Sequence, residues 1–155
     1  MPFTFSQTIL NGANRFHTAP APLRHRPLCP TRLAIGTLNI RDVKGFGLVQ
    51  ATRSVERGGL DVMLLTEAKI HTELYSHNHL GYNVTCSKAH SYSNGVAWGG
   101  VGLVTREWPD GWGIESTRFH GPNVVSCEIV TGPTQTPLVG AYFPPSTLEH
   151  LPYIK

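Results

Sequence analysis

The sequence is poor in cysteine, and its thiols follow no pairing pattern. Its three cysteines, Cys29, Cys86 and Cys127, are an odd number with no Cys-x-x-Cys spacing. A disulfide framework needs an even set and a zinc ribbon needs closely spaced pairs, so both classes are disfavoured. We expect reduced thiols in an intracellular protein.

The sequence also lacks long apolar runs. No segment approaches the ~20 consecutive apolar residues that cross a bilayer, so we expect no membrane partner. The amino terminus has no basic region followed by an apolar stretch, which argues against a secretory signal. A chain of 155 residues with 40% hydrophobic content fits one globular domain with a sizeable core.

Acidic residues are missing from the first 32 positions, which contain four Arg and no Asp or Glu. Four prolines fall between positions 20 and 30, so residues 1–32 are predicted to be a disordered leader. An organellar targeting peptide is the alternative, although such dense proline disrupts the amphipathic helix that targeting uses. Residues 33–155 form the predicted domain, with nine basic and ten acidic residues and thus a net charge of −1. That balance does not by itself argue for a nucleic-acid partner.

The first positive feature of the sequence is a pair of apolar segments on either side of a helical pattern. Residues 33–39 and 61–67 are predicted strands, and the apolar residues between them recur at near-helical spacing. Gly58 and Gly59 supply a stop for that helix. A strand, a crossover helix and a second strand make a parallel pair, because this connection returns the chain in the same direction.

Each of these two strands ends on an oxygen-bearing side chain, Asn39 in the first and Glu67 in the second. Parallel neighbours bring both side chains to the carboxyl edge of one sheet, where open α/β sheets place their ligands. An amide oxygen beside a carboxylate suits Mg²⁺. The alternatives are an Asn39 that bonds its own turn and a Glu67 that is a solvated strand end.

The rest of the chain has the pattern of shorter strands and turns. Five further strands are predicted between turns that contain Gly, Pro or Asn, at residues 82–87, 101–106, 114–119, 124–130 and 137–143. Clean alternation in 124–130 predicts that Val125, Cys127 and Ile129 share one face. The fold class expected is α+β, an incomplete two-layer α/β sandwich with a mixed sheet and flanking helices.

The sequence pattern at the carboxyl end predicts the start of a further helix. Ser146 and Glu149 have the spacing of a capping box, in which the two side chains bond the first free amides of a helix, and the chain ends six residues later. A helix of that length is marginal in water, so the sequence is expected to be cut off. The preceding sheet is expected to leave an exposed edge through which chains could self-associate.

Four segments, at residues 37–41, 64–69, 99–104 and 140–145, occur in the order and spacing of the endonuclease/exonuclease/phosphatase superfamily. The chain resembles most closely the apurinic-type endonuclease domain of LINE-type (non-LTR) retrotransposons. The resemblance covers residues 33–155 and corresponds to the amino-terminal half of the family fold. It implies a deoxyribonuclease-I-like sandwich.

The resemblance also implies a site and a chemistry. The family's metal-binding residues fall on Asn39 and Glu67, and its active-site Tyr, a catalytic residue, falls on Tyr142. It implies Mg²⁺ as cofactor, DNA as partner and, for a retroelement-derived protein, a nuclear location. Arg41 stands where many members carry a second acidic or amide residue, and no Asp follows Asp110 to supply the family's later Asp-x-Asn and Asp-His motifs. A general base typically contributes 10²–10⁴-fold to the rate, so this chain alone is expected to be nearly inactive.

Two other functions stay open at this point. One is a non-enzymatic remnant or interaction module, and the other is a phosphatase-type member of the same superfamily that acts on lipids or sugars. Tyr142 can equally be a core aromatic residue.

Two further residue groups are open to more than one interpretation. His77 and His79, with His71 and Cys86, suggest zinc, but their spacing fits no standard structural site. Four glycines favour a tight turn and close strand packing over a phosphate-binding loop, and three tryptophans favour packing over base stacking. These are Gly95, Gly99, Gly100 and Gly102, and Trp98, Trp108 and Trp112.

Overall fold

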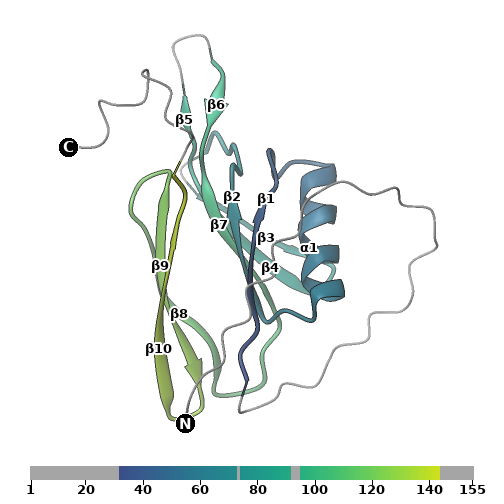
Figure 1. Cartoon of the computed structure of the whole chain (residues 1–155), viewed down its shortest axis with the longest axis vertical. Coiled ribbons are helices and arrows are strands. Elements are labelled where there is room, and N and C mark those ends of the chain that lie inside the picture. Colours follow the sequence, from purple (N-terminus) through teal and green to yellow (C-terminus); the bar gives the residue numbers. More distant parts are fainter. Residues whose placement is uncertain (1–31, 73, 92–94, 144–155) are drawn as a thin grey trace.

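The computed structural model describes residues 32–72, 74–91 and 95–143, and it has an α+β fold with a mixed sheet. A helix, a five-stranded sheet and a three-stranded sheet lie in layers (Figure 1). The elements in chain order are β1 (Ile35–Asn39), α1 (Phe46–Gly58), β2 (Val62–Thr66), β3 (Leu74–His79), β4 (Tyr82–Ser87), β5 (His90–Ser91), β6 (Ala97–Trp98), β7 (Val101–Arg106), β8 (Trp112–Phe119), β9 (Val124–Thr131) and β10 (Thr134–Ala141). Among these residues, no helix has the length and hydrophobicity needed to cross a membrane.

The large sheet has the strand order β1-β2-β7-β4-β3, and its only parallel pairing among the described strands is that of β1 with β2. In that register Ile35 pairs with Val62 and Asn39 pairs with Thr66. The predicted parallel pair is therefore confirmed. β7 lies between β2 and β4 because its residues, buried on both faces, suit a central strand.

Helix α1 covers one face of the large sheet. Its buried stripe includes Leu48, Ala51 and Val55, which pack with apolar residues of β1, β2, β4 and β7. The helix ends as predicted, because Gly59 adopts a left-handed conformation with φ 56°. Its amide bonds the carbonyl of Glu56 at 3.1 Å.

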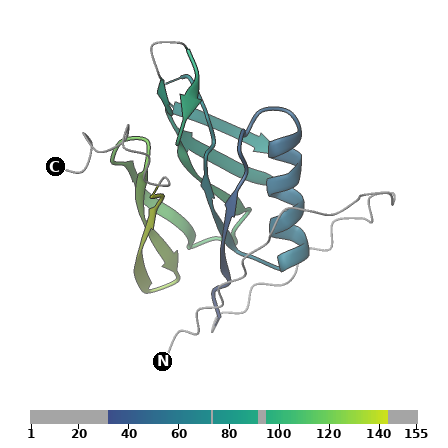
Figure 2. The same ribbon diagram turned by 45° about the horizontal axis from the view of Figure 1, so that its top comes forward.

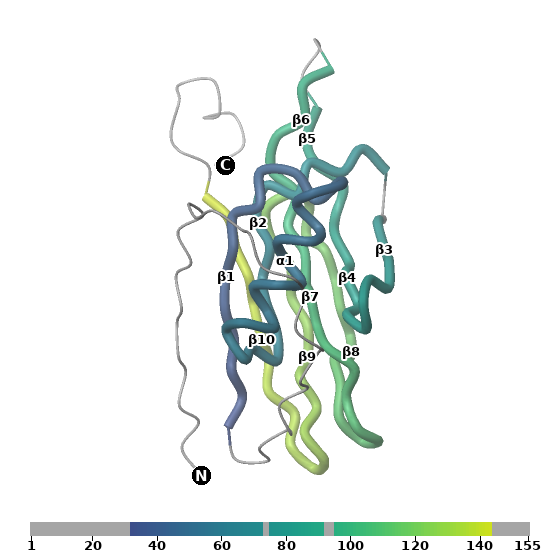
Figure 3. The backbone as a smooth tube through the Cα atoms, turned by 90° about the vertical axis from the view of Figure 1, so that its right-hand side faces the viewer, coloured from purple at the N-terminus to yellow at the C-terminus, as the bar shows by residue number. Residues whose placement is uncertain are grey.

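The small sheet, of order β10-β9-β8, packs on the opposite face (Figure 2). The buried residues of β9 are Val125, Cys127 and Ile129, so the alternation predicted from the sequence is confirmed. Strands of both sheets run along the long axis of the molecule (Figure 3). Where the sheets approach closely, an added Cβ at Gly140 would lie 2.5 Å from Leu64 Cδ2.

An ion pair is buried within the large sheet. Arg106 at the end of β7 lies 2.6 Å from Asp61 Oδ1, and both side chains are more than nine-tenths buried. The other oxygen of Asp61 accepts a hydrogen bond from the Ala34 amide at 2.8 Å. The carboxylate therefore ties the start of β1 to β2 and β7.

Several strand predictions are confirmed and others are corrected. Residues 82–87 and 101–106 are strands with the predicted bounds, whereas β10 begins at Thr134 and ends at Ala141 rather than spanning 137–143. The reason is a two-residue turn, with Gly132 at φ 63°, that lets Thr131 and Thr134 pair directly.

The expectations about flanking helices, the two chain ends and self-association are met only in part or are not tested. The prediction of flanking helices is met by α1 alone within the described part of the chain. The leader up to residue 31 and the expected helix at 146–149 lie outside the described residues. Self-association through a sheet edge stays a prediction.

The glycine interpretation is confirmed by the space around these residues. At Gly102 an added Cβ would lie 2.5 Å from Cys86 Sγ and 2.7 Å from the Thr85 carbonyl oxygen. Gly99 and Gly100 both have positive φ, at 72° and 84°. These residues permit a turn and close packing, which any larger residue would obstruct.

Candidate functional site

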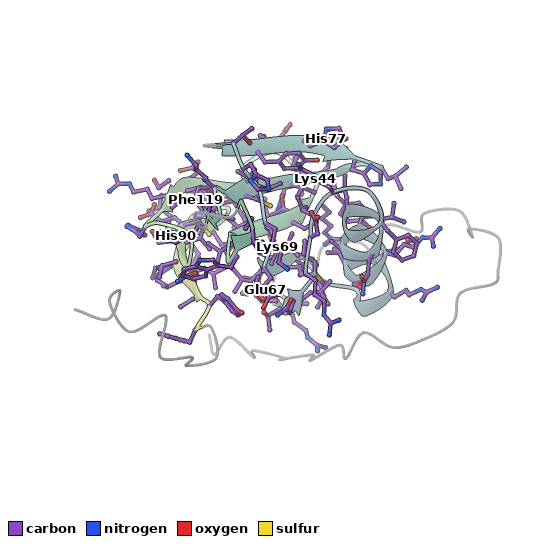
Figure 4. The ribbon with its side chains drawn as sticks, turned by 90° about the horizontal axis from the view of Figure 1, so that it is seen from above. Lys44, Glu67, Lys69, His77, His90 and Phe119 are labelled. Atoms are coloured by element: carbon purple, nitrogen blue, oxygen red, sulfur yellow. The ribbon has the colours of Figure 1, made fainter. Side chains whose placement is uncertain are left out.

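Asn39 and Glu67 meet at the carboxyl edge of the large sheet. Asn39 is the last residue of β1 and pairs with Thr66, the last residue of β2, so Glu67 follows directly at the same edge. The Asn39 side chain donates a hydrogen bond to the Glu67 carboxylate. Their predicted convergence is confirmed as geometry, and their role as metal ligands stays a prediction. Figure 4 looks down on this edge, with Glu67 labelled beside Lys69.

The backbone at Glu67 is held in an unusual conformation. Glu67 has φ 57° and Lys69 has φ 53°, in the left-handed region that costs a non-glycine residue of order 1–3 kcal/mol. The segment is fixed to the neighbouring loop, since the Ala68 amide bonds the Gly100 carbonyl at 3.0 Å and the Lys69 amide bonds the Gly99 carbonyl at 3.1 Å. The bend turns the chain at the sheet edge, and the two glycines allow the neighbouring loop to approach it.

Tyr142 reaches this carboxylate from the small sheet. Its hydroxyl donates a hydrogen bond of 2.5 Å to Glu67 Oε1, although 75 positions separate the two residues. Its backbone amide bonds the Asn123 carbonyl at 2.8 Å, which fixes the chain just after β10. The ring also packs on the apolar residues between the sheets, as the core interpretation expects, and the catalytic role of Tyr142 stays a prediction.

The charges around Glu67 favour its ionised form. Burial raises the pKa of Glu67, but hydrogen bonds from Tyr142 and Asn39 and the charges of Lys69 and Arg41 outweigh it and lower the pKa below its usual value. For Tyr142, burial raises the pKa far above its usual value, and the hydrogen bond and negative charge of Glu67 raise it further. At neutral pH the pair is therefore a carboxylate acceptor and a protonated phenol donor.

Asn39 has a second hydrogen bond within its own turn. Its Oδ1 accepts from the Arg41 amide at 3.2 Å, and Arg41 has φ 60°. The local-turn alternative for Asn39 is therefore also correct, because the oxygen bonds the turn while the amide nitrogen bonds Glu67. This leaves one lone pair of Oδ1 for another ligand.

The donor set among the described residues is incomplete for a metal ion, and Mg²⁺ binding stays a prediction. Within the part of the chain that the structure describes, no group of three or more His, Cys, Asp or Glu side chains is placed to hold a metal ion. Mg²⁺, however, usually keeps several waters and uses one or two carboxylates together with substrate phosphates. Glu67 and Asn39 offer hard oxygen atoms of that kind. Arg41 brings a positive charge close to the carboxylate.

Other candidate residues lie outside this cluster. Burial raises the pKa of Cys86 to about 12 and that of Cys127 to about 11, so both stay neutral thiols and neither suits a metal site. Trp98 meets His90 edge to face, with ring centres 4.9 Å apart. Lys69 and the Asn123 carbonyl were missed from the sequence, because only the turn at Glu67 and the docking of β10 bring them to the site.

The sequence matches no protein-family model, and no curated protein matches it.

Proposed function

We propose that Asn39, Glu67 and Tyr142 form part of the site of a Mg²⁺-dependent phosphodiesterase domain of the deoxyribonuclease-I-like type, with DNA as its substrate. The observation that carries the proposal is the hydrogen bond between Tyr142 and Glu67. It joins an ionised carboxylate and a phenol from two different sheets at the edge where Asn39 also lies. The family resemblance of the segments around these residues supports the same function.

Each residue has a role that follows from its contacts. Glu67, kept ionised, supplies the negative charge that attracts a divalent cation, and Asn39 orients this carboxylate. Tyr142 stays protonated and can transfer its hydrogen bond from Glu67 to a phosphate oxygen. Bound Mg²⁺ would polarise a phosphoryl oxygen and stabilise the leaving oxygen.

None of the three residues can serve as a general base for water. The pKa of Glu67 is lowered, so its carboxylate accepts a proton poorly. The pKa of Tyr142 is raised, so its phenol keeps its proton near neutral pH. Water must therefore be activated by a group outside this cluster. We accordingly propose that the chain by itself is nearly inactive.

Metal binding tests the proposal directly, with Mn²⁺ as a paramagnetic probe of a magnesium site. In the full chain, Mn²⁺ is expected to broaden the amide NMR signals of residues 39–41 and 67–69 before others. Glu67→Gln should abolish this broadening because the carboxylate charge is removed. Glu115→Gln, a change at an exposed carboxylate of β8, is the matched control and should leave it intact.

A second function, a non-enzymatic remnant or interaction module, is favoured by a specific observation. Glu67 already accepts hydrogen bonds from Tyr142 and Asn39 and lies near two cations, so the cluster is satisfied as a structural link between the sheets. In that case Mn²⁺ would broaden signals evenly along the surface, and Glu67→Gln would change stability but not the broadening pattern. That result would overturn the phosphodiesterase proposal.

A further inference from the structure

Two histidines lie side by side on β3, an outer strand of the large sheet. His77 and His79 are two positions apart, so the strand presents both rings on one face. Their ring centres are 6.1 Å apart and the rings are inclined by 31°. Tyr75 continues the row, with its ring centre 6.0 Å from that of His77. Figure 4 shows His77 at the outer part of the sheet, well away from Glu67.

The neighbours of these histidines offer little to bond an imidazole. On β4, Val84 pairs with His77 and Tyr82 pairs with His79. Nε2 of His79 is enclosed and has no hydrogen-bond partner among the described residues. This nitrogen has lost water without gaining a partner, which is unfavourable and calls for a ligand that the amino acids around it do not provide.

We propose that His77 and His79 form a two-imidazole binding site for a borderline divalent transition-metal ion such as Zn²⁺, Ni²⁺ or Cu²⁺. Such an ion lies about 2.1 Å from each ligating nitrogen, which places the two ring centres about 5–6 Å apart. The observed separation of 6.1 Å lies close to this range. Imidazole nitrogens select these ions over Mg²⁺ and Ca²⁺, which prefer oxygen.

The remaining positions on the ion are filled by water. Cys86, on the neighbouring strand opposite Tyr75, is a buried thiol whose pKa is raised to about 12, so it adds no thiolate. The proposed site has two protein ligands and so differs from structural zinc sites, which have four and whose ligand spacing these histidines do not match. It is also separate from the Glu67 cluster in position and in ligand chemistry.

The test is a titration of the full chain with CuCl₂ followed by electron paramagnetic resonance, and with ZnCl₂ followed by calorimetry. The copper spectrum is expected to show coupling to two nitrogens. His77→Ala and His79→Ala should each weaken binding about tenfold or more, since even the groups that support a ligand contribute that much. His120→Ala, which removes an exposed histidine just after β8, should leave affinity unchanged.

A variant with the same amino-acid composition tests whether the two histidines must lie on the same face of β3. Asn78→His combined with His79→Asn keeps two histidines but places them on opposite faces of β3. It should lose the two-nitrogen signal and bind no better than a single-histidine variant, while its circular dichroism shows that the fold is kept. Unchanged affinity in this variant, or in the double variant His77→Ala with His79→Ala, would overturn the proposal.

Discussion

At the scale of single residues, the phenol of Tyr142 is the contact on which the site depends. It is the only one of the three site residues that comes from the small sheet, and it donates to the same carboxylate that Asn39 orients. Its effect on Glu67 is electrostatic as well as structural, because a hydrogen bond donated to a carboxylate stabilises the ionised form.

Tyr142→Phe should therefore lower stability in a pH-dependent way. The pKa of folded Glu67 is lowered, so this stabilisation is present above the usual carboxylate pKa and is lost as pH falls through the folded value. At pH 7 the free energy of unfolding should fall by about 1–2 kcal/mol, a value reduced for partial solvent screening. Urea titrations of both proteins from pH 7 to pH 3 should show the difference shrinking.

Tyr75→Phe is the matched control for this experiment. Tyr75 lies on β3, far along the sheet from Glu67, and burial is the leading cause that raises its pKa. Removing the Tyr75 hydroxyl should leave unchanged the way in which the free energy of unfolding falls between pH 7 and pH 3. A loss of stability in Tyr142→Phe that is equal at all these pH values would contradict the proposed link to Glu67.

Asn39 and Glu67 could be predicted from the sequence because each follows a recognisable strand, and parallel strands share an edge. The contact with Tyr142 could not be derived from local pattern, since it depends on how the small sheet docks and where β10 ends. The family resemblance supplied that residue. The left-handed conformations of Arg41, Glu67 and Lys69 had no sequence signal, because these residue types rarely adopt positive φ.

At the scale of elements, the buried ion pair between Asp61 and Arg106 holds three strands together. It joins the beginning of β2 to the end of β7, and Asp61 also accepts the amide of Ala34 before β1. A buried pair of this kind contributes little compared with apolar residues, but removing one partner leaves the other charge buried.

Asp61→Asn should therefore destabilise the protein by about 3–5 kcal/mol, measured by urea denaturation at pH 7. Replacing both members, with Asp61→Leu and Arg106→Met, should recover much of this loss because no charge is then left buried. Asp110→Asn, at an exposed position, should change the free energy of unfolding by less than about 0.5 kcal/mol. A small effect of Asp61→Asn would show that Arg106 is well solvated without its partner.

Strand prediction succeeded where local pattern determines structure. β4 and β7 have continuous or alternating apolar residues, and their bounds match the prediction. β3 was missed because its sequence, Leu-Tyr-Ser-His-Asn-His, is mostly polar, and its pairing with β4 is decided by tertiary contacts. The two-residue strands β5 and β6 were missed because segments this short have no periodicity.

At the scale of the whole molecule, the three described residues of the proposed site include no group suited to activate water. The described residues provide a carboxylate, an amide and a phenol at one edge, and the sequence has no Asp beyond Asp110. Phosphodiester cleavage needs a nucleophile as well as charge stabilisation. Under the proposed function, the group that activates water would have to lie outside Asn39, Glu67 and Tyr142.

The 155-residue chain with Mg²⁺ should accordingly show no measurable nicking of supercoiled DNA. Joined to a family carboxyl half that carries the Asp-x-Asn and Asp-His motifs, it should gain nicking activity that Glu67→Ala abolishes. Gel assays of both proteins check this. Activity that survives Glu67→Ala in the fusion would contradict the site assignment, and strong Glu67-dependent nicking by the chain alone would contradict the predicted inactivity.

The 75-position separation of Tyr142 from Glu67 has a consequence for the order of folding. Asn39 and Glu67 are brought together by β1, α1 and β2, a compact unit of short range, whereas the phenol arrives only after the hairpin of β9 and β10 has docked. Closing so long a loop is slow compared with forming the local unit. The early folding chain would hold a carboxylate without its phenol partner, and anything that binds all three side chains would favour the docked state of the two sheets.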